Sequence, residues 1–458
     1  MDGPSMILAD HVATFDAARL GETTIKATKR ALSDGIGVML AASGLSRDIA
    51  PFVGLARNGG GGTASLLGHD QRVQPALAAL ANGAMAHALD YEDAFDPVPC
   101  HPNAALIPAL LAVAEAVGPV PGRELLAAVA LGCDLACRLA LAVGRPLEEG
   151  GWYPPPIFGG FGAVAAAARI LRLDARQTAD AFSLMLLQTC PGEIKYAPET
   201  VLRAVREAFP ARAAVEAALL AKGGVRGFDR PFEGTAGFFR LYSGGLFDPA
   251  ALTEALGARF HIEDLSFKRW PACRGTHAYI ETAQRLRATI GDWRRIARID
   301  IEGGPDQVML AEPEASKKRP STAIDAKFSL PFTVASTFVH GDIGLASFSE
   351  TALADDQVLA LAARAHFTRR ADWTRAHAAS SRLAITLDDG TTLVAEEMVA
   401  LGGPKRPLSD QELAGKFRQC AGLAARPWSE ARATAFLGAV DGLDRVADST
   451  LALALTEA

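Results

Sequence analysis

Apolar residues recur at spacings of three and four along most of the first 260 residues, which is the pattern of helices with one buried face. The helices predicted in this way are Thr24–Ala42, Gln74–Leu89, Ala104–Ala116, Arg123–Val143, Gly160–Leu171, Ala175–Leu187 and Glu207–Ala221. Asp174 is placed to cap the start of the sixth helix. The stretch NGGGGTASLLG, which ends at Gly68, predicts a tight turn and a short extended piece. A phosphate-binding loop would need a following Lys-Ser or Lys-Thr.

The pattern changes after about residue 265, where apolar and polar residues alternate in three segments. Alternation predicts strands over Arg295–Gly303, Ser381–Leu387 and Thr391–Val399, and the Asp389-Gly390 turn joins the last two as a β-hairpin. Helices are predicted beside these strands at Thr276–Ile290 and Leu330–Phe348, and helical spacing returns over Ser409–Val446.

These elements predict a mainly α protein with two domains. A large all-α helical domain is built from both chain ends, residues 1–267 and 404–458, and a smaller α+β domain spans residues 268–403. The boundary at the end of the smaller domain is marked by Gly402-Gly403-Pro404.

Composition is typical of a soluble globular enzyme, with 458 residues, of which 49% are hydrophobic and 21% charged. The formal net charge of −6, without a long basic stripe, argues against nucleic acid as a partner. Six scattered cysteines include no CxxC pair, and Cys133 and Cys137 are interpreted as small core residues. We therefore expect a reduced, cytoplasmic protein.

Neither a signal peptide nor a membrane partner is expected from the sequence. The first residues, MDGPSMILADHVATF, lack a cleavable apolar core. The most apolar stretch, Leu125–Val143, is interrupted by Gly132, Asp134 and Arg138, which suits a buried helix better than a membrane span.

The densest set of proton-transferring groups lies in residues 82–116. These groups are His87, Asp90, Glu92, Asp93, Asp96, Cys100 and His101. Ionised groups among apolar residues need partners or shifted pKa values, so their concentration indicates a catalytic rim. Prolines 97, 99 and 102 restrict the backbone around His101. The alternative is a polar connection between two core helices.

A second concentration, residues 267–286, brings Lys268, Arg269 and Arg274 close together, with Cys273 and His277 among them. Helical spacing begins after these cations, so they are expected beside a helix N-terminus, which favours anions. The segment therefore predicts a site for a small carboxylate substrate. The alternative is a domain hinge whose cations are solvated.

A third concentration, residues 325–342, contains Lys327 before an apolar helix, with Ser329 as its cap. By itself this pattern favours a surface lysine, although Lys327 is retained as a candidate for substrate binding. No HExxH, paired histidines at i and i+4, or DxDxDG loop occurs in the sequence, so no metal site is predicted. The remaining possibility is acid–base catalysis without a cofactor, at a cleft between the two domains.

These segments, in this order, resemble the MmgE/PrpD family, which includes 2-methylcitrate dehydratases, cis-aconitate decarboxylases and iminodisuccinate epimerases. The motifs that carry the resemblance are NGAMAHALDYEDAF, CHPNAALIPALLAVAEA, GGFGAVAAAARILRLDARQ, VEAALLAKGGVRGF, FEGTAGFF, FKRWPACRGTHAYI and AKFSLPFTVAS. The resemblance implies a large all-α domain, a smaller α+β lid and a homodimer. It also implies a cleft that binds small di- or tricarboxylates without a metal or organic cofactor.

The resemblance carries over to three residues directly. Asp90 and His101 stand where the family has an active-site aspartate and histidine, and Lys268 stands where decarboxylase-like members have a lid-side lysine. At other positions this sequence departs from those members. The departures are Ala94 for threonine, Tyr153 for a second histidine, Arg203 for lysine, Cys273 for histidine or another polar group, and Phe332 for tyrosine.

The predicted reaction begins with removal of a proton α to a carboxylate. His101 is the predicted base, and Asp90 is predicted to orient it or to tune its basicity. Cys273 and His277 are the candidates for an acid on the opposite face. Lys268 is also predicted to be catalytic, and together with Arg274 and Arg203 it would hold carboxylates and stabilise the developing negative charge. The predicted substrate-binding residues are Arg274, Arg203, Tyr153, Lys327 and Asp93.

Elimination of the dehydratase type is the first choice for the overall reaction. Epimerisation is an alternative, because it needs two proton-transferring groups on opposite faces of the substrate, and Cys273 opposite His101 would supply them. The third hypothesis is a carboxylate-binding protein without catalytic activity. The replacement of family residues by Tyr153 and Phe332 favours this hypothesis, because it removes groups that could transfer protons.

Overall fold

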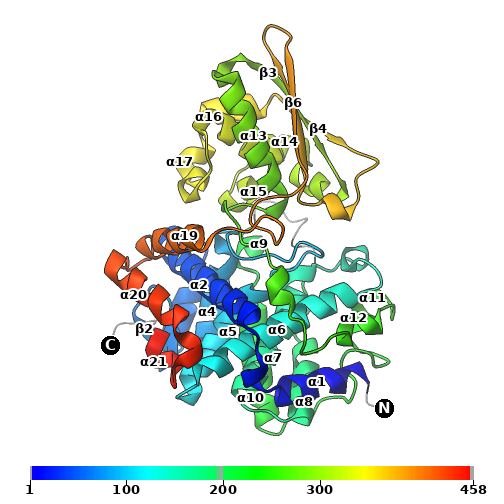
Figure 1. Cartoon of the computed structure of the whole chain (residues 1–458), viewed down its shortest axis with the longest axis vertical. Coiled ribbons are helices and arrows are strands. Elements are labelled where there is room, and N and C mark those ends of the chain that lie inside the picture. The colour runs from blue at the N-terminus through cyan, green and yellow to red at the C-terminus, as the bar shows by residue number, and fades with distance from the viewer. Residues whose placement is uncertain (1–2, 193, 195–199, 454–458) are drawn as a thin grey trace.

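The computed structural model describes residues 3–192, 194 and 200–453. Helices from both ends of the chain form the larger, lower part of the molecule in Figure 1, and a sheet with its own helices forms the upper part. The first and last helices of the described residues, α1 (Pro4–Thr14) and α21 (Ser449–Leu453), both lie in the lower part.

The helices of the lower part include all seven predicted for the first 260 residues. They are α1 (Pro4–Thr14), α2 (Glu22–Leu45), α3 (Ala50–Asn58), α4 (Pro75–Ala88), α5 (Pro102–Val117), α6 (Gly122–Ala142), α7 (Pro154–Ile170), α8 (Ala175–Leu186), α9 (Leu202–Val205), α10 (Ala208–Lys222), α11 (Phe238–Ser243), α12 (Pro249–Thr253), α19 (Asp410–Gly422), α20 (Glu430–Asp441) and α21 (Ser449–Leu453). Helix α7 starts earlier than predicted, because prolines fit the first turn of a helix, where no N–H partner is needed. Asp174 caps α8 as predicted.

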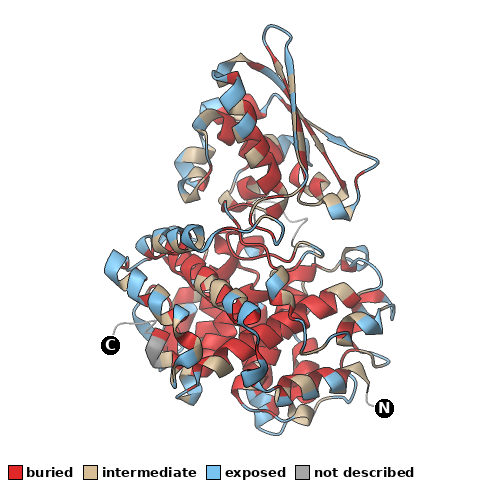
Figure 2. Ribbon diagram, in the orientation of Figure 1, coloured by how far each residue is buried: buried red, intermediate tan, exposed pale blue. Residues whose placement is uncertain are grey.

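The core of this part is built around α5, which packs against α4, α6 and α7. Figure 2 shows these central helices as buried along most of their length. Helices α6 and α7 approach closely at Gly132 and Gly162. A Cβ atom at Gly132 would lie 2.4 Å from the carbonyl oxygen of Gly162, so a larger residue there would separate the helices.

Helix α6 is long and apolar enough to cross a membrane by length and composition. However, 94% of its most apolar 18-residue window is buried inside the structure, as in a core helix of a globular protein. The strands outside the upper part are short among the described residues. They are β1 (Gly61–Leu66), which is the short extended piece predicted before Gly68, and β2 (Gln71–Val73), which pairs with it and was not predicted.

The upper part contains a four-stranded sheet in the order β4-β3-β5-β6. Its strands are β3 (Ile296–Gly303), β4 (Ala365–Arg369), β5 (Ser381–Leu387) and β6 (Thr392–Glu397). Strand β3 pairs in parallel with β4 and antiparallel with β5, and β5 forms the predicted hairpin with β6. The three predicted strands are confirmed. Strand β4 was not predicted, because its five residues are too few to establish an alternation.

The helices of the upper part are α13 (His277–Ile290), α14 (Glu314–Lys318), α15 (Ala323–Lys327), α16 (Leu330–His340), α17 (Glu350–Leu353) and α18 (Asp356–Ala362). The prediction of one helix to Phe348 is wrong, because Gly341 takes the left-handed conformation (φ +90°) and ends α16. The predicted run Ser409–Val446 is likewise divided into α19 and α20, with Pro427 between them.

Short 3-10 helices connect these elements. They are Ala17–Arg19, Leu147–Gly150, His261–Asp264, Arg274–Thr276, Trp293–Arg295, Pro305–Leu310, Leu345–Phe348, Arg375–His377 and Leu443–Arg445. After the sheet, the chain returns to the lower part, where α19 packs against α2. The division into domains at residues 267/268 and 403/404 stays a prediction.

A buried ion pair fixes this returning segment. Lys416 of α19 lies 2.7 Å from Asp34 of α2, and both side chains are almost fully buried. The same ammonium donates hydrogen bonds to the carbonyl oxygens of Tyr91 (2.7 Å) and Lys268 (3.1 Å). The C-terminal helices are therefore tied to the two segments that the sequence identified as chemically active.

Replacing Lys416 with Met should lower the free energy of unfolding by about 3–5 kcal/mol, because it leaves the buried Asp34 carboxylate without a partner. Adding Asp34→Asn to this variant should restore part of the loss, since the unpaired charge is then removed. Urea unfolding followed by circular dichroism measures both effects. A loss below about 1 kcal/mol for Lys416→Met would contradict the importance of the pair.

Candidate active site

A cavity of about 170 Å³ is lined by residues from both parts of the molecule. Five of the ten predicted site residues line it, namely Asp90, His101, Tyr153, Cys273 and Arg274. The first three belong to the lower part, and the last two directly precede α13. The volume is below the usual range for drug-sized ligands, so the cavity suits a small metabolite.

His101 lies directly before α5, where Pro102 occupies the first helical position. Its Nδ1 lies 2.8 Å from the carbonyl oxygen of Asp93. A carbonyl oxygen only accepts hydrogen bonds, so Nδ1 carries the proton and Nε2 keeps a free electron pair. Burial lowers the pKa of His101 well below 6.5, although the nearby Glu92 carboxylate acts in the opposite direction. The imidazole is therefore neutral at neutral pH and able to accept a proton.

Glu92, rather than Asp90, is the carboxylate beside His101. Its Oε1 lies 3.1 Å from Nδ1 of His101, and the same oxygen accepts a hydrogen bond from Nδ1 of His87. The prediction that Asp90 orients His101 is corrected accordingly. Asp90 has a left-handed backbone (φ +49°) at the turn after α4, where Lys268 binds its carboxylate.

Asp90 and Lys268 form a fully buried ion pair. The Lys268 ammonium lies 2.7 Å from Asp90 Oδ1 and also donates to the Asp90 carbonyl oxygen at 3.0 Å. Burial opposes the charge of Lys268, but Asp90 and Glu92 outweigh this effect and raise its pKa. Asp90 Oδ2 has no hydrogen-bond partner among the described residues, and Asp90 lines the cavity. This oxygen is therefore available to a bound molecule, whereas Lys268 is not among the lining residues.

Lys327 is buried, although its local sequence favoured a surface position. Its ammonium donates to the carbonyl oxygens of Leu89 (2.8 Å) and Pro271 (2.9 Å), which belong to the two parts of the molecule. Burial lowers the pKa of Lys327 to about 7. The residue therefore joins the turn after α4 to the segment before α13, and it does not line the cavity.

Three consecutive carbonyl oxygens of the turn after α4 each accept a hydrogen bond from a different buried lysine. The pairs are Leu89 with Lys327, Asp90 with Lys268, and Tyr91 with Lys416. The lysines come from α15, the segment before α13, and α19. Backbone groups of a turn are usually solvated or bonded to nearby residues. Here they are held by long-range contacts, and the position of the turn depends on them.

Cys273 and Arg274 line the cavity from the other part of the molecule. Burial raises the pKa of the Cys273 thiol to about 11, so the thiol is protonated at neutral pH and can donate a proton. Arg274 is bound by Asp96 through Nε (3.0 Å) and Nη2 (3.0 Å). Its Nη1 donates to the Leu401 carbonyl oxygen at 2.6 Å, so Arg274 contributes charge to the cavity while its donors are occupied.

The remaining predicted residues lie outside the cavity lining. His277 is buried and donates from Nε2 to the Ala272 carbonyl oxygen at 3.2 Å, which does not place it opposite His101. The Arg203 guanidinium lies 4.7 Å from the centre of the Phe328 ring. The Asp93 carboxylate accepts a hydrogen bond from Asn103 (2.6 Å), and burial raises the pKa of Asp93 to about 7.

Several residues behind His101 were not predicted as members of the site. Arg206 contacts Nε2 of His87 through Nη1 and lies 3.0 Å from Glu207 through Nε. Burial raises the pKa of Glu207 to about 7. His87 and Glu92 belong to the same polar concentration as Asp90 and could have been chosen from it. The sequence around Arg206 and Glu207 contains no comparable concentration of polar residues, so it gave no signal for a site.

The buried atoms of His87, Asp90 and Glu92 lie within 4.8 Å of one another, which is close enough to bind one metal ion. Arg206 and Lys268 already lie against these three side chains. A divalent cation would have to displace these cations or be repelled by them, so the donor set fits an ion-pair network better than a metal site.

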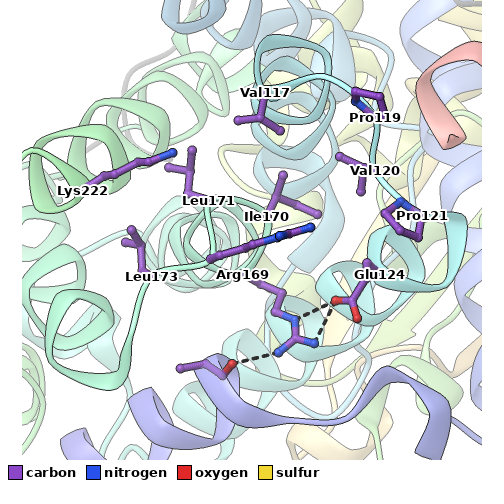
Figure 3. Close-up of a pocket in the computed structure, with 12 residues that line it drawn as sticks. Val117, Pro119, Val120, Pro121, Glu124, Arg169, Ile170, Leu171, Leu173 and Lys222 are labelled. Carbon is purple, nitrogen blue, oxygen red and sulfur yellow. Dashed lines mark hydrogen bonds and ion pairs between the residues drawn. The ribbon is translucent and has the colours of Figure 1, made fainter. Parts of the chain in front are cut away.

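A larger cavity of about 680 Å³ lies near the ends of α5, α7 and α10 (Figure 3). Arg169 is bound there by Glu124 at 2.8 Å and by the carbonyl oxygen of Ala13 at 2.9 Å. None of the predicted site residues lines this cavity. The smaller cavity beside His101 is therefore the candidate active site.

Comparison with known proteins gives matches along nearly the whole chain. The model of the MmgE/PrpD N-terminal domain matches residues 6–249, and that of the MmgE/PrpD C-terminal domain matches residues 270–436. A cis-aconitate decarboxylase-like protein, oryM, from Aspergillus oryzae is 28% identical over 79% of this chain and 78% of its own length. The cis-aconitate decarboxylase of Homo sapiens is 26% identical over 76% and 73%, respectively. That of Aspergillus terreus is 23% identical over 84% and 82%.

His101 should remain neutral, with the proton on Nδ1, until the pH falls well below 6.5. Nitrogen-15 NMR of histidine-labelled protein measures the tautomer and the titration, and the His101→Asn variant assigns the resonance. Glu92→Gln should lower the pKa of His101 further, because the carboxylate stabilises the imidazolium. A His101 pKa at or above 6.5 in the unsubstituted protein would contradict this account of the site.

Proposed function

Because the chain belongs to the MmgE/PrpD family, we propose that it is a lyase or isomerase of the type found in that family. Its substrate is a small di- or tricarboxylate, and no cofactor takes part. The first step removes a proton from the carbon next to a carboxylate. Elimination of a β-substituent then follows.

The observation that carries this proposal is the state of His101. Its Nδ1 is committed to the Asp93 carbonyl oxygen and to Glu92, so Nε2 is the basic atom. A neutral imidazole with a fixed tautomer is what a general base requires at neutral pH. Its side chain is 14% exposed and lines the cavity, which supports access for a small substrate.

The other lining residues support the same reaction. Removal of the proton places negative charge on the substrate carboxylate, and the fixed charge of Arg274 favours this charge. The Cys273 thiol supplies a proton at neutral pH. Lys268 acts through Asp90, since it holds that carboxylate in place while Oδ2 of Asp90 stays available to the substrate.

Epimerisation is the second candidate, and the position of Cys273 favours it. Cys273 and His101 line the same cavity from different parts of the molecule. One group that accepts a proton and one that donates a proton are the minimum for inversion at a carbon centre. The relatives are decarboxylases by name, so loss of carbon dioxide belongs in any screen.

Incubation with a library of di- and tricarboxylates in D2O, followed by proton NMR and mass spectrometry, tests the proposal. Washout of an α-hydrogen alone indicates epimerisation, a new vinyl resonance indicates elimination, and loss of a carboxyl carbon indicates decarboxylation. His101→Asn keeps the size and polarity of the side chain but removes the base. It should reduce turnover at least about 100-fold.

The matched control is His340→Asn, because His340 is exposed and pairs with Asp355 away from the cavity. This variant should retain full turnover. Full activity in His101→Asn would overturn the proposed mechanism. Complete absence of hydrogen exchange and product across the library would favour the carboxylate-binding protein without catalysis.

We also propose a homodimer, which the family resemblance implies. Large apolar side chains at and near α9 and α10 are more than one third exposed in the single chain; they are Leu202, Phe209, Leu219 and Leu220. Multi-angle light scattering at micromolar concentration should give about twice the chain mass of 48.0 kDa. Charged substitutions at Phe209 and Leu220 should shift the mass toward the monomer, and a monomer before substitution would contradict the proposal.

A further inference from the structure

Three charged side chains at the cavity were not identified by any motif. They are Glu148, Asp306 and Arg375, and all three line the cavity together with His101 and Cys273. Glu148 lies in the 3-10 helix between α6 and α7. Asp306 and Arg375 lie in two 3-10 helices of the part that contains the sheet. Arg375 therefore connects the two parts of the molecule at the cavity.

The contacts of Arg375 are loose. Its Nη2 lies 3.4 Å from Glu148 Oε1 and 3.4 Å from Asp306 Oδ1, at the long end of hydrogen-bond distances. Among the described residues, Nε and Nη1 of Arg375 donate no hydrogen bond. The side chain is 38% exposed, whereas Glu148 and Asp306 are 21% and 29% exposed.

The backbone that carries Arg375 is fixed. Gln307 is fully buried, and its Nε2 donates to the carbonyl oxygens of His377, Ala378 and Ser380. His377 in turn accepts a hydrogen bond from the backbone N–H of Thr374 at 3.1 Å. The guanidinium can therefore change partners without movement of the chain that bears it.

The other lining cation is already saturated, because Arg274 binds Asp96 and the Leu401 carbonyl oxygen. Arg375 is thus the cation of the described cavity lining that retains donors for a ligand. A guanidinium binds a carboxylate best through two parallel N–H donors, and Arg375 makes only two long contacts through one nitrogen.

We infer that Arg375 is the receptor for a second substrate carboxylate, remote from the carbon that loses its proton, and that Glu148 and Asp306 hold it in the absence of substrate. This inference rests on the proposed carboxylate substrate. The Glu148–Arg375 contact then selects for substrates with more than one carboxylate. The second carboxylate of such a substrate would form two short hydrogen bonds with the Arg375 guanidinium, and these would replace its two long contacts with Glu148 and Asp306.

The test is calorimetric titration with propane-1,2,3-tricarboxylate, a saturated molecule without a leaving group. Arg375→Met should weaken its binding about 10- to 100-fold, the loss expected for hydrogen bonds between charged groups. Arg375→Lys should bind with intermediate affinity, since it keeps the charge but not the fork of donors. Glu148→Gln should bind about 2- to 5-fold more tightly, because one competitor for Arg375 is weakened.

Two control variants distinguish the loss of a specific contact at the cavity from a change in the net charge of the protein. Arg369→Met and Glu149→Gln change the same charges at exposed neighbours that do not line the cavity, and both should bind as the unsubstituted protein does. If the Glu148–Arg375 contact only held the two parts of the molecule together, Glu148→Gln and Arg375→Met would both weaken binding of the tricarboxylate. This result would overturn the inference. Unchanged affinity in a folded Arg375→Met variant would also overturn it.

Those two results leave the proposed function standing, because the unsubstituted protein still binds the tricarboxylate. Failure of the unsubstituted protein to bind propane-1,2,3-tricarboxylate would overturn the inference. It would also remove tricarboxylates from the proposed substrate class, and the D2O screen would then decide the proposed function independently.

Discussion

The turn between α4 and α5 is the constraint on which the candidate site depends. Its successive carbonyl oxygens, from Leu89 to Tyr91, are bound by lysines from three segments that lie 178 to 325 residues further along the chain. Buried ammonium groups are stable only with close partners, and buried carbonyl groups likewise. Each lysine therefore satisfies the turn and is satisfied by it. Removal of one partner would leave the other buried without a hydrogen bond, which is costly in a low-dielectric interior.

The same constraint decides the ionisation of the site. Burial favours neutral forms, and only specific pairs oppose it. Lys268 stays charged because Asp90 lies 2.7 Å away, whereas burial lowers the pKa of Lys327, which contacts carbonyl oxygens. His101 is neutral, since burial outweighs the effect of Glu92. A neutral base and a protonated Cys273 thiol at one cavity follow from these balances, and both suit proton transfer.

The arrangement also separates two kinds of charge. The innermost ions are paired at short distances, as Lys268 is with Asp90, and Arg274 is held by several partners, among them Asp96. Arg375 is partly exposed, with long contacts to two carboxylates from different parts of the molecule. Fixed charges set the electrostatic environment of a reaction, whereas a loosely held cation can exchange its partner for a ligand. The cavity thus combines charges that are fixed by several partners with one cation, Arg375, that can exchange its partners for a ligand.

The sequence by itself determined seven helices of the lower part, helix α13, three of the four sheet strands and two of the segments that contribute to the site. These features depend on local periodicity, caps and turns, such as Asp174 before α8 and the Asp389-Gly390 turn between β5 and β6. It also identified Asp90, His101, Cys273 and Arg274, because they stand in dense polar segments. Only the tertiary structure decided which carboxylate contacts His101, that Lys327 is buried, that His277 lies outside the cavity, and that Glu148 and Arg375 meet. These outcomes depend on contacts between residues that are far apart in the chain, and local spacing carries no information about which distant charges will share a buried space.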